Sequence, residues 1–399
     1  MSLTPARFIL LTIFLFGQVS AHATPTTPSS DAQVLERLPF KPTDPVAREM
    51  ANLRTQLRSD PKNLKVAVQL AQRYYDLVGE EGDPRYLGYA QAALAPWWEL
   101  PAPPDEVQLL RASLRQFRHD FAGAIADLDA LIVRNPKHPQ ARALRAVLHI
   151  VQARYSQGRA DCSALGELSS ELITTGCEAM VDGINGKSSS AYQELLAAFQ
   201  DDPKASGANQ IWVLMRLAEM AQRLGKTSAA QAHFKQALDL DIPNTLLLAA
   251  YADFLLDQQR MAEIITLLKD KTRSDTLLLR LVLAEHSLKH AQAQQNITVL
   301  ANRYNAAQMR GDTVHQQEEA RFALAIENNP KKSLKLAQEN WKVQREPRDA
   351  RVLLEAAVAA KDAAAAQPVL EWLAQSHHED PIILNLARQL APQKTVGSK

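Results

Sequence analysis

The chain has 399 residues, of which 46% are hydrophobic and 22% charged, a balance that is ordinary for a soluble globular protein. Its 45 basic and 44 acidic residues give a net charge of +1, so no overall field favours a nucleic acid or an anionic lipid as the partner. Only 14 glycines are present, and alternating Val/Ile/Thr segments are scarce. These features argue against a sheet-rich fold and against glycine-rich phosphate loops.

Residues 1–23 have the layout of an export signal. Arg7 supplies the positive segment, residues 8–16 the apolar segment, and an Ala-His-Ala sequence ending at Ala23 the cleavage site. The apolar segment is shorter than the roughly 20 residues that a membrane span requires. We therefore expect cleavage after Ala23, a periplasmic or secreted protein without a membrane span, and a flexible leader over residues 24–43. An uncleaved N-terminal anchor is the alternative.

Residues 44–390 have the hydrophobic periodicity of helices almost throughout. In the clearest unit, apolar residues share one face of a first helix, Gly225 ends that helix, and further apolar residues mark one face of a second. The first group is Leu214, Leu217 and Ala218, and the second is Ala230, Phe234 and Ala237. The same spacing returns about every 33 to 39 positions, a period that is typical of stacked helical hairpins.

This pattern resembles the tetratricopeptide repeat, although Leu214 and Ala221 stand where that repeat has Trp and Tyr. Small residues let the two helices of such a hairpin approach closely, and a bulky residue fills the joint to the next hairpin. The resemblance covers roughly residues 45–390 and implies an all-α fold, a right-handed α-solenoid of about eight to nine hairpins. It places the small residue of successive second helices at Tyr86, Ala124, Gly158, Ala191, Ala230 and Glu263.

Helical periodicity continues beyond residue 275, with a weaker repeat pattern. We expect breaks near Gly311, Asn329-Pro330, Glu346-Pro347 and Lys361-Asp362, and a disordered tail over residues 391–399. Short stretches here, such as Asn340-Trp341, are similar to exported bacterial repeat proteins.

Cys162 and Cys177 are the only cysteines in the chain. We expect one helix from Tyr155 to Leu168 and the next from Glu171 to Ile184, and the point midway between the cysteines falls in the turn between them. Residues equidistant from the turn of an antiparallel hairpin lie side by side, so the pattern predicts a structural disulfide. A redox-active pair and a two-cysteine metal site are the alternatives, but there is no C-x-x-C spacing and no nearby His.

No known catalytic motif is present: neither a P-loop, a G-x-S-x-G sequence, an H-E-x-x-H sequence nor a dinucleotide-binding glycine pattern. The sequence predicts no catalytic residue, no cofactor and no metal. Residues 377–380, His-His-Glu-Asp, are the densest ligand-like cluster. Pro381 follows at once, so a solvated turn between helices is favoured over a metal site.

Aromatic residues provide candidate contacts. Trp97 and Trp98 lie in a proline-rich connector, where either one indole packs between the first two units and the other lies on the surface, or the pair forms an exposed ledge for a partner. Trp212, Trp341 and Trp372 have the spacing of core residues. The resemblance implies ligand contacts on first-helix residues of the concave face, namely Gln72, Tyr75, Gln116, Trp212, Glu219, Gln222 and Arg223. These types suit the capture of an extended peptide, and any solvated helix face has a similar composition.

The sequence thus predicts a periplasmic scaffold or adaptor that binds other proteins, with a role in cell-envelope assembly or export. The rival interpretation is an enzyme or a glycan-binding protein with a site in the less regular region 275–345. A purely structural subunit is the third.

Overall fold

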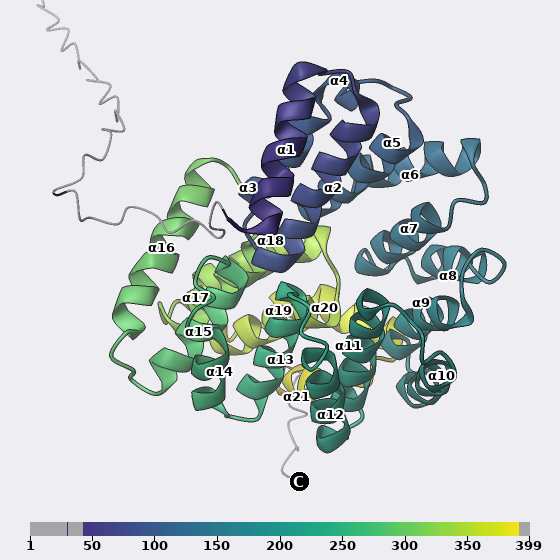
Figure 1. Ribbon diagram of the computed structural model, residues 1–399. Coiled ribbons are helices and arrows are strands. Elements are labelled where there is room, and N and C mark those ends of the chain that lie inside the picture. Colours follow the sequence, from purple (N-terminus) through teal and green to yellow (C-terminus); the bar gives the residue numbers. More distant parts are fainter. Residues whose placement is uncertain (1–29, 31–42, 391–399) are drawn as a thin grey trace, which may run out of the picture. The chain divides into compact units, whose positions relative to one another are not determined.

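The computed structural model describes residue 30 and residues 43–390. This part of the chain consists of helices, with no strand (Figure 1). The predicted export signal, nearly all of the predicted leader, and the predicted C-terminal tail lie outside it. None of the described helices combines the length and the apolar character that crossing a bilayer requires.

The chain divides into two units, with the boundary after Glu49, inside the first helix, α1 (Pro45–Ser59). The described residues of the first unit form a short turn and the beginning of α1. Here the Asp44 side chain accepts a hydrogen bond from the backbone N–H of Val46 at 2.8 Å. Everything below concerns the second unit, residues 50–399.

The second unit is a succession of helical hairpins, in agreement with the predicted all-α solenoid. The nine hairpins of the described residues are α2 (Leu64–Glu81) and α3 (Arg85–Ala93), α5 (Asp105–Phe117) and α6 (Phe121–Arg134), α7 (Pro139–Val151) and α8 (Tyr155–Ser163), α9 (Glu171–Ile184) and α10 (Ser188–Asp201), α11 (Gly207–Arg223) and α12 (Thr227–Leu238), α13 (Thr245–Asp257) and α14 (Met261–Leu268), α15 (Asp275–Ser287) and α16 (Ala293–Met309), α17 (Gln316–Ala325) and α18 (Pro330–Val343), and α19 (Pro347–Ala360) and α20 (Gln367–Ser376). The short elements α4 (Ala95–Trp98) and η1 (Ala364–Ala366) lie in connections, and α21 (Pro381–Leu390) follows the last hairpin. All four predicted breaks beyond residue 275 fall at helix boundaries, and the less regular region 275–345 forms α15 to α18.

Close packing within the hairpins follows the predicted small residues. Ala124, Gly158, Ala191 and Ala230 are each the fourth residue of a second helix, and all four are buried. Gly225 has a left-handed backbone, with φ of +70°, just after α11. It therefore ends that helix as expected, because glycine adopts this conformation without steric cost.

Two of the aligned positions are wrong. Glu263 is exposed and pairs with Arg260 at 2.6 Å, and the first fully buried residue of α14 is Ile264, one position later. Tyr86 is half-buried beside Tyr74, and Ala90 is the fully buried small residue of α3. Both helices are short, and the repeat period alone does not show at which residue each helix begins. The small-residue positions assigned from the period are therefore displaced here.

The predicted disulfide between Cys162 and Cys177 is confirmed, with the two Cα atoms 5.3 Å apart. It joins α8 to α9, and both cysteines are buried. Helix α9 has the predicted bounds, and its N-cap Ser170 accepts the N–H of Ile173 at 3.4 Å. Helix α8 ends at Ser163 rather than Leu168, because the chain turns there and buries Leu165.

The hairpin stack also closes on itself. Near the end of α2, Asp83 forms an ion pair with Arg273 at 3.1 Å, and the Glu80 carbonyl accepts a hydrogen bond from the Thr245 hydroxyl at 3.3 Å. The Asp83 carboxylate therefore lies between hairpins that are far apart in the sequence, and its cationic partners hold its pKa below the usual value even though burial opposes this.

A second closure joins the last hairpins to α7, α8 and α10. The backbone N–H of Arg345 donates to the carbonyl of Val151 at 2.8 Å, and the N–H of Ser188 donates to the Glu379 carboxylate at 2.8 Å. In an open solenoid, each repeat would contact only its neighbouring repeats. The C-terminal helices here instead pack against the middle of the chain.

A glycine sets the spacing between α9 and α11. A Cβ placed on Gly176 would lie 2.3 Å from the Trp212 ring, so the indole packs directly against the helix backbone. On α3, by contrast, a Cβ on Gly88 would meet nothing within 4 Å.

We expect Gly176→Ala to lower the free energy of unfolding by about 1–3 kcal/mol, because the new methyl group overpacks the joint. The matched variant Gly88→Ala should raise it by roughly 0.5–1 kcal/mol, since alanine is the better helix former. Chemical denaturation followed by circular dichroism measures both. Equal shifts in the two variants would contradict the packing described for Trp212.

Replacing both cysteines by alanine should cost about 3 kcal/mol of stability, the chain-entropy value for a loop of this length. The comparison is chemical denaturation of the wild type and the Cys162→Ala/Cys177→Ala variant without reductant. Adding reductant should move the wild type to the midpoint of the variant. A variant with the oxidised wild-type midpoint would show that the disulfide does not stabilise the fold.

Candidate functional site

A cavity of about 610 Å³ lies where the last hairpins meet the middle of the chain. We call it the seam pocket. Its walls come from the α7–α8 connection and α8, the end of α9, α18 and the residues that follow it, α19, and the segment from η1 to α20. The lining residues are Ala153, Tyr155, Asn185, Gln338, Glu339, Trp341, Lys342, Arg345, Leu353, Ala365, Pro368, Glu371, Trp372, Gln375 and Ser376.

Aromatic side chains form one wall of the seam pocket. The rings of Trp341 and Trp372 are nearly perpendicular, at 80°, with centroids 5.7 Å apart. The indole N–H of Trp372 donates to the Tyr155 hydroxyl at 2.7 Å. Burial raises the pKa of Tyr155 to about 12, so this hydroxyl stays protonated at physiological pH. The wall is therefore rigid and neutral.

Charged groups around the pocket balance one another. Glu339 and Lys342 form an ion pair at 2.7 Å, and Arg345 donates through Nε to the Trp341 carbonyl at 3.2 Å. Glu371 accepts a hydrogen bond from Gln367 at 3.0 Å. The lining thus contains two carboxylates and two cationic groups and has no excess charge.

Two side-chain amides of the lining are available for a ligand. The amides of Gln338 and Gln375 make no hydrogen bond within the part of the chain that the structure describes. Ser376 is 2% exposed, and its Oγ has no hydrogen-bond partner among the described residues. Because this oxygen has almost no accessible surface, it offers no hydrogen bond to a ligand in the pocket.

The turn of residues 377–380 packs against the end of α9, and the expectation that this turn is solvated is wrong for His378. That side chain is 2% exposed, and its Nδ1 lies 3.1 Å from the Ile184 carbonyl. Because a carbonyl only accepts, Nδ1 carries the proton, and Nε2 is buried without a partner among the described residues. Burial, reinforced by Arg223, lowers the pKa of His378 to about 4.

The predicted contacts of the first two hairpins do not line the seam pocket. Gln72 is exposed and donates to Asp76 at 2.8 Å. Tyr75 is half-buried, with its ring edge-on to Phe117 at 5.5 Å, and burial raises its pKa. Gln116 is half-buried. Their role in binding stays a prediction.

The predicted contacts on α11 are engaged within the protein. Trp212 is half-buried against Gly176, and Glu219 pairs with Arg216 at 3.3 Å. Gln222 donates to Asp257 at 2.8 Å.

Arg223 is half-buried, with Nη1 donating to the Gly183 carbonyl and Nε to the Glu219 carbonyl at 3.3 Å. Burial lowers its pKa. Arg223, a predicted ligand contact, thus holds α9 to α11. Whether the four α11 residues also bind a partner stays a prediction.

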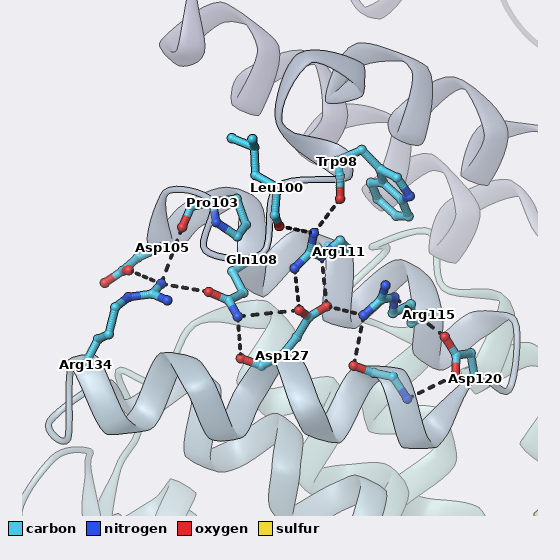
Figure 2. A network of polar contacts seen from close by, with 11 residues as sticks. Trp98, Leu100, Pro103, Asp105, Gln108, Arg111, Arg115, Asp120, Asp127 and Arg134 are labelled. Atoms are coloured by element: carbon cyan, nitrogen blue, oxygen red, sulfur yellow. Dashed lines mark hydrogen bonds and ion pairs between the residues drawn. The ribbon is translucent and has the colours of Figure 1, made fainter.

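Trp98 is fixed by a polar network, shown in Figure 2. Arg111 donates to the carbonyls of Trp98 and Leu100 and forms an ion pair with the buried Asp127 at 2.6 Å. Arg115 also pairs with Asp127, at 2.8 Å. These bonds hold the proline-rich connector onto the hairpin of α5 and α6.

Both indoles of the connector, Trp97 and Trp98, are half-buried, rather than one wedged and one exposed. Their role as a ledge stays a prediction.

The seam pocket itself is absent from the sequence-based predictions. Trp341 and Trp372 are core residues, as their spacing predicts, at 5% and 6% exposure. A repeat period shows which hairpins are neighbours in the chain, but it carries no signal for a contact between distant hairpins.

No family model matches the sequence, and no curated protein matches it significantly. Among solved structures, a tetratricopeptide repeat protein from Parabacteroides merdae shares 16% identity, with a TM-score of 0.46, over 60% of this chain and 92% of its own. The human IFIT1 dimer with m7Gppp-AAAA shares 13%, with a TM-score of 0.43, over 87% of each chain. Yeast Tom70 shares 13%, with a TM-score of 0.39, over 86% of this chain and 85% of its own. These similarities concern the arrangement of helices alone.

Because His378 is buried against the end of α9, the stability of the fold depends on pH. In the unfolded chain the imidazole takes up a proton near pH 6.5, whereas in the folded chain it does so only near pH 4. The unfolded state therefore binds more protons as the pH falls through this window, and stability is lost. The loss approaches about 3 kcal/mol for a shift of this size.

We expect His378→Asn, which keeps a donor for the Ile184 carbonyl, to show a shallower loss of stability between pH 6.5 and 4 than the wild type. Denaturation midpoints across this range provide the measurement. Comparing the variant with the wild type cancels the contributions of other titrating groups. Asp349 is one of these: burial raises its pKa, so its contribution to stability changes with pH in the opposite direction. Parallel pH profiles would show that His378 does not titrate as described.

Proposed function

We propose that this protein is an exported scaffold or adaptor that holds a segment of another protein in the seam pocket. The observation that carries the proposal is the pocket: a rigid aromatic wall beside two glutamine amides that have no partner among the described residues. Its volume of about 610 Å³ lies within the usual range of ligand sites.

The chemistry of the lining favours recognition over catalysis. No His or Cys lies among the lining residues, so the Ser376 hydroxyl has no imidazole base to activate it there. The two carboxylates, Glu339 and Glu371, are hydrogen-bonded to neighbouring side chains of their own helices. What the pocket offers is hydrogen bonding and apolar contact.

The proposed location is the periplasm. The charged, apolar and small-residue segments before Thr24 support export, and a disulfide between buried cysteines is typical of an oxidising compartment. A protein-binding scaffold there would serve cell-envelope tasks, such as outer-membrane assembly, pilus or polysaccharide export, or maturation of an oxidoreductase complex.

Two neighbouring residues of α20 provide the test. Gln375 is exposed and lines the pocket, whereas Ala374 is exposed and does not. We expect Gln375→Arg to abolish retention of the partner, because a long cationic side chain fills the mouth, and Ala374→Arg to leave it unchanged. The measurement is affinity capture from an extract of the producing cell, with quantitative mass spectrometry of the retained proteins.

Both substitutions place arginine at an exposed helical position, so equal circular dichroism and equal thermal midpoints are the control. If the two folded variants retain the same proteins in wild-type amounts, the seam pocket is not the site.

A further inference from the structure

We propose that His378 makes the seam pocket sensitive to acid: when the imidazole takes up a proton, the turn of residues 377–380 leaves the ends of α9 and α10, the Trp372 wall loosens, and the bound partner is released. This proposal rests on the proposed function and deepens it by naming how binding is regulated. We call residues 377–380 the C-terminal turn.

The C-terminal turn contacts the aromatic wall of the pocket directly. The ring centroids of His378 and Trp372 are 5.2 Å apart, and the Trp372 indole N–H donates to the Tyr155 hydroxyl. Nδ1 of His378 donates to the carbonyl of Ile184, the residue before the pocket-lining Asn185. The imidazole therefore contacts both α20 and the end of α9, two of the elements that form the walls of the pocket.

Close packing holds the C-terminal turn in place. A Cβ placed on Gly186, in the connection between α9 and α10, would lie 3.1 Å from the Cβ and the carbonyl oxygen of His377. The Glu379 carboxylate accepts the N–H of Ser188, the first residue of α10, at 2.8 Å. His377 has a left-handed backbone, with φ of +53°, a conformation that is unfavourable for a residue with a Cβ. The turn is thus held by the contacts of its neighbours, among which is the buried His378.

The buried imidazole accommodates one proton but not a second. His378 is 2% exposed, and because its Nδ1 donates to a carbonyl, Nε2 is the atom that a second proton would occupy. Nε2 has no hydrogen-bond partner among the described residues. A second proton would create a buried donor without an acceptor on a charged ring, which is costly. In the released turn the imidazolium is solvated, so proton uptake favours release.

The charge nearest in effect also opposes protonation. Arg223 on α11 acts on the imidazole and disfavours a second positive charge beside it. Glu379, in the same turn, acts in the opposite direction, but its carboxylate already accepts the N–H of Ser188. Burial and Arg223 together outweigh it, so the pKa of His378 is lowered.

Other charged groups on the neighbouring elements are bonded elsewhere. Asp182 on α9 pairs with Arg159 and with Lys187, the latter at 3.4 Å. Asp380 accepts two backbone N–H groups in the first turn of α21, one of them at 2.8 Å. Glu371 of α20 is hydrogen-bonded within its own helix. These groups therefore leave Nε2 without an acceptor in the packed turn.

The size of the effect follows from the proton affinities of the packed and the released turn. In the packed turn the pKa of His378 is about 4, whereas an exposed imidazole has the ordinary value of 6.5. The released turn therefore binds the proton more tightly, and the ratio of released to packed turn rises as the pH falls from 6.5 to 4. This rise is about tenfold per pH unit and roughly 300-fold in all.

The experiment is hydrogen exchange of the full chain between pH 6.5 and 4, followed by mass spectrometry and corrected for the intrinsic exchange rate at each pH. We expect exchange in residues 184–190 and 372–384 to rise toward roughly 300-fold, because both segments lose their contacts when the turn is released. Exchange in the hairpin of α5 and α6 should respond much less, since release of the turn is a local event.

Two adjacent histidines provide matched variants, because His378 is buried and His377 is exposed. His378→Asn keeps a donor for the Ile184 carbonyl and takes up no proton, so its exchange should lose the rise. His377→Asn should keep it, since asparagine tolerates a left-handed backbone. The slopes against pH are compared, so a change in the overall stability of either variant does not alter the result.

The proposal is overturned if exchange in the two segments does not rise toward pH 4, if it rises equally in His378→Asn, or if it is lost in His377→Asn. An equal rise in the hairpin of α5 and α6 would also overturn it, because the opening would then be global.

Regulation of binding is measured on the proteins that the wild type captures and Gln375→Arg does not. When the pH is lowered stepwise, the wild type and His377→Asn should release them at a higher pH than His378→Asn does. Release from all three at the same pH would show that the turn does not regulate binding. If the wild type captures no such protein, the scaffold function is wrong, and the exchange results alone decide whether acid releases the turn.

Discussion

One hydrogen bond, from the Trp372 indole to the Tyr155 hydroxyl, marks the contact on which the candidate site depends. Each hairpin of a solenoid is stable through its immediate neighbours, and nothing in that scheme brings the ninth hairpin to the third. The aromatic contact does so, together with the backbone bond from Arg345 to Val151. The seam pocket exists only because these elements meet.

The same closure changes how the stack should respond to damage. In an open solenoid, destabilisation stays with adjacent repeats. Here Glu379 caps the first turn of α10, and His378 bonds the end of α9, so the C-terminal turn is part of the stability of the middle hairpins. Long-range contacts of this kind couple distant repeats and make their unfolding more cooperative.

Charged groups between hairpins serve the closure as well. Asp253 on α13 pairs with Arg280 at 2.6 Å and Arg321 at 2.9 Å, and these cations hold its pKa near 2 against the effect of burial. Asp257 pairs with Arg351 of α19 at 2.7 Å. Removing one member of such a pair leaves a partly buried charge uncompensated, so these residues tie α13 to the later helices. Because these side chains are paired within the protein, they are not available to bind a partner.

Local features could be predicted from the sequence because they depend on residues close together in the chain. The helices follow from apolar periodicity, the disulfide from the symmetry of Cys162 and Cys177 about one turn, and the end of α11 from Gly225. The errors at Tyr86 and Glu263 arise where short helices start off the repeat register, since periodicity does not locate a helix boundary to within one residue.

The candidate site, by contrast, was decided by tertiary structure alone. Trp341 and Trp372 were predictable as core residues, but the space between them and Tyr155 arises from the packing of distant hairpins. Arg223 looks in the sequence like an exposed contact, and the fold turns it toward the Gly183 carbonyl. Sequence determined the hairpins because their packing is local and repeats with the chain. Their closure depends on the sum of small rotations between hairpins, a quantity that no single residue pattern encodes.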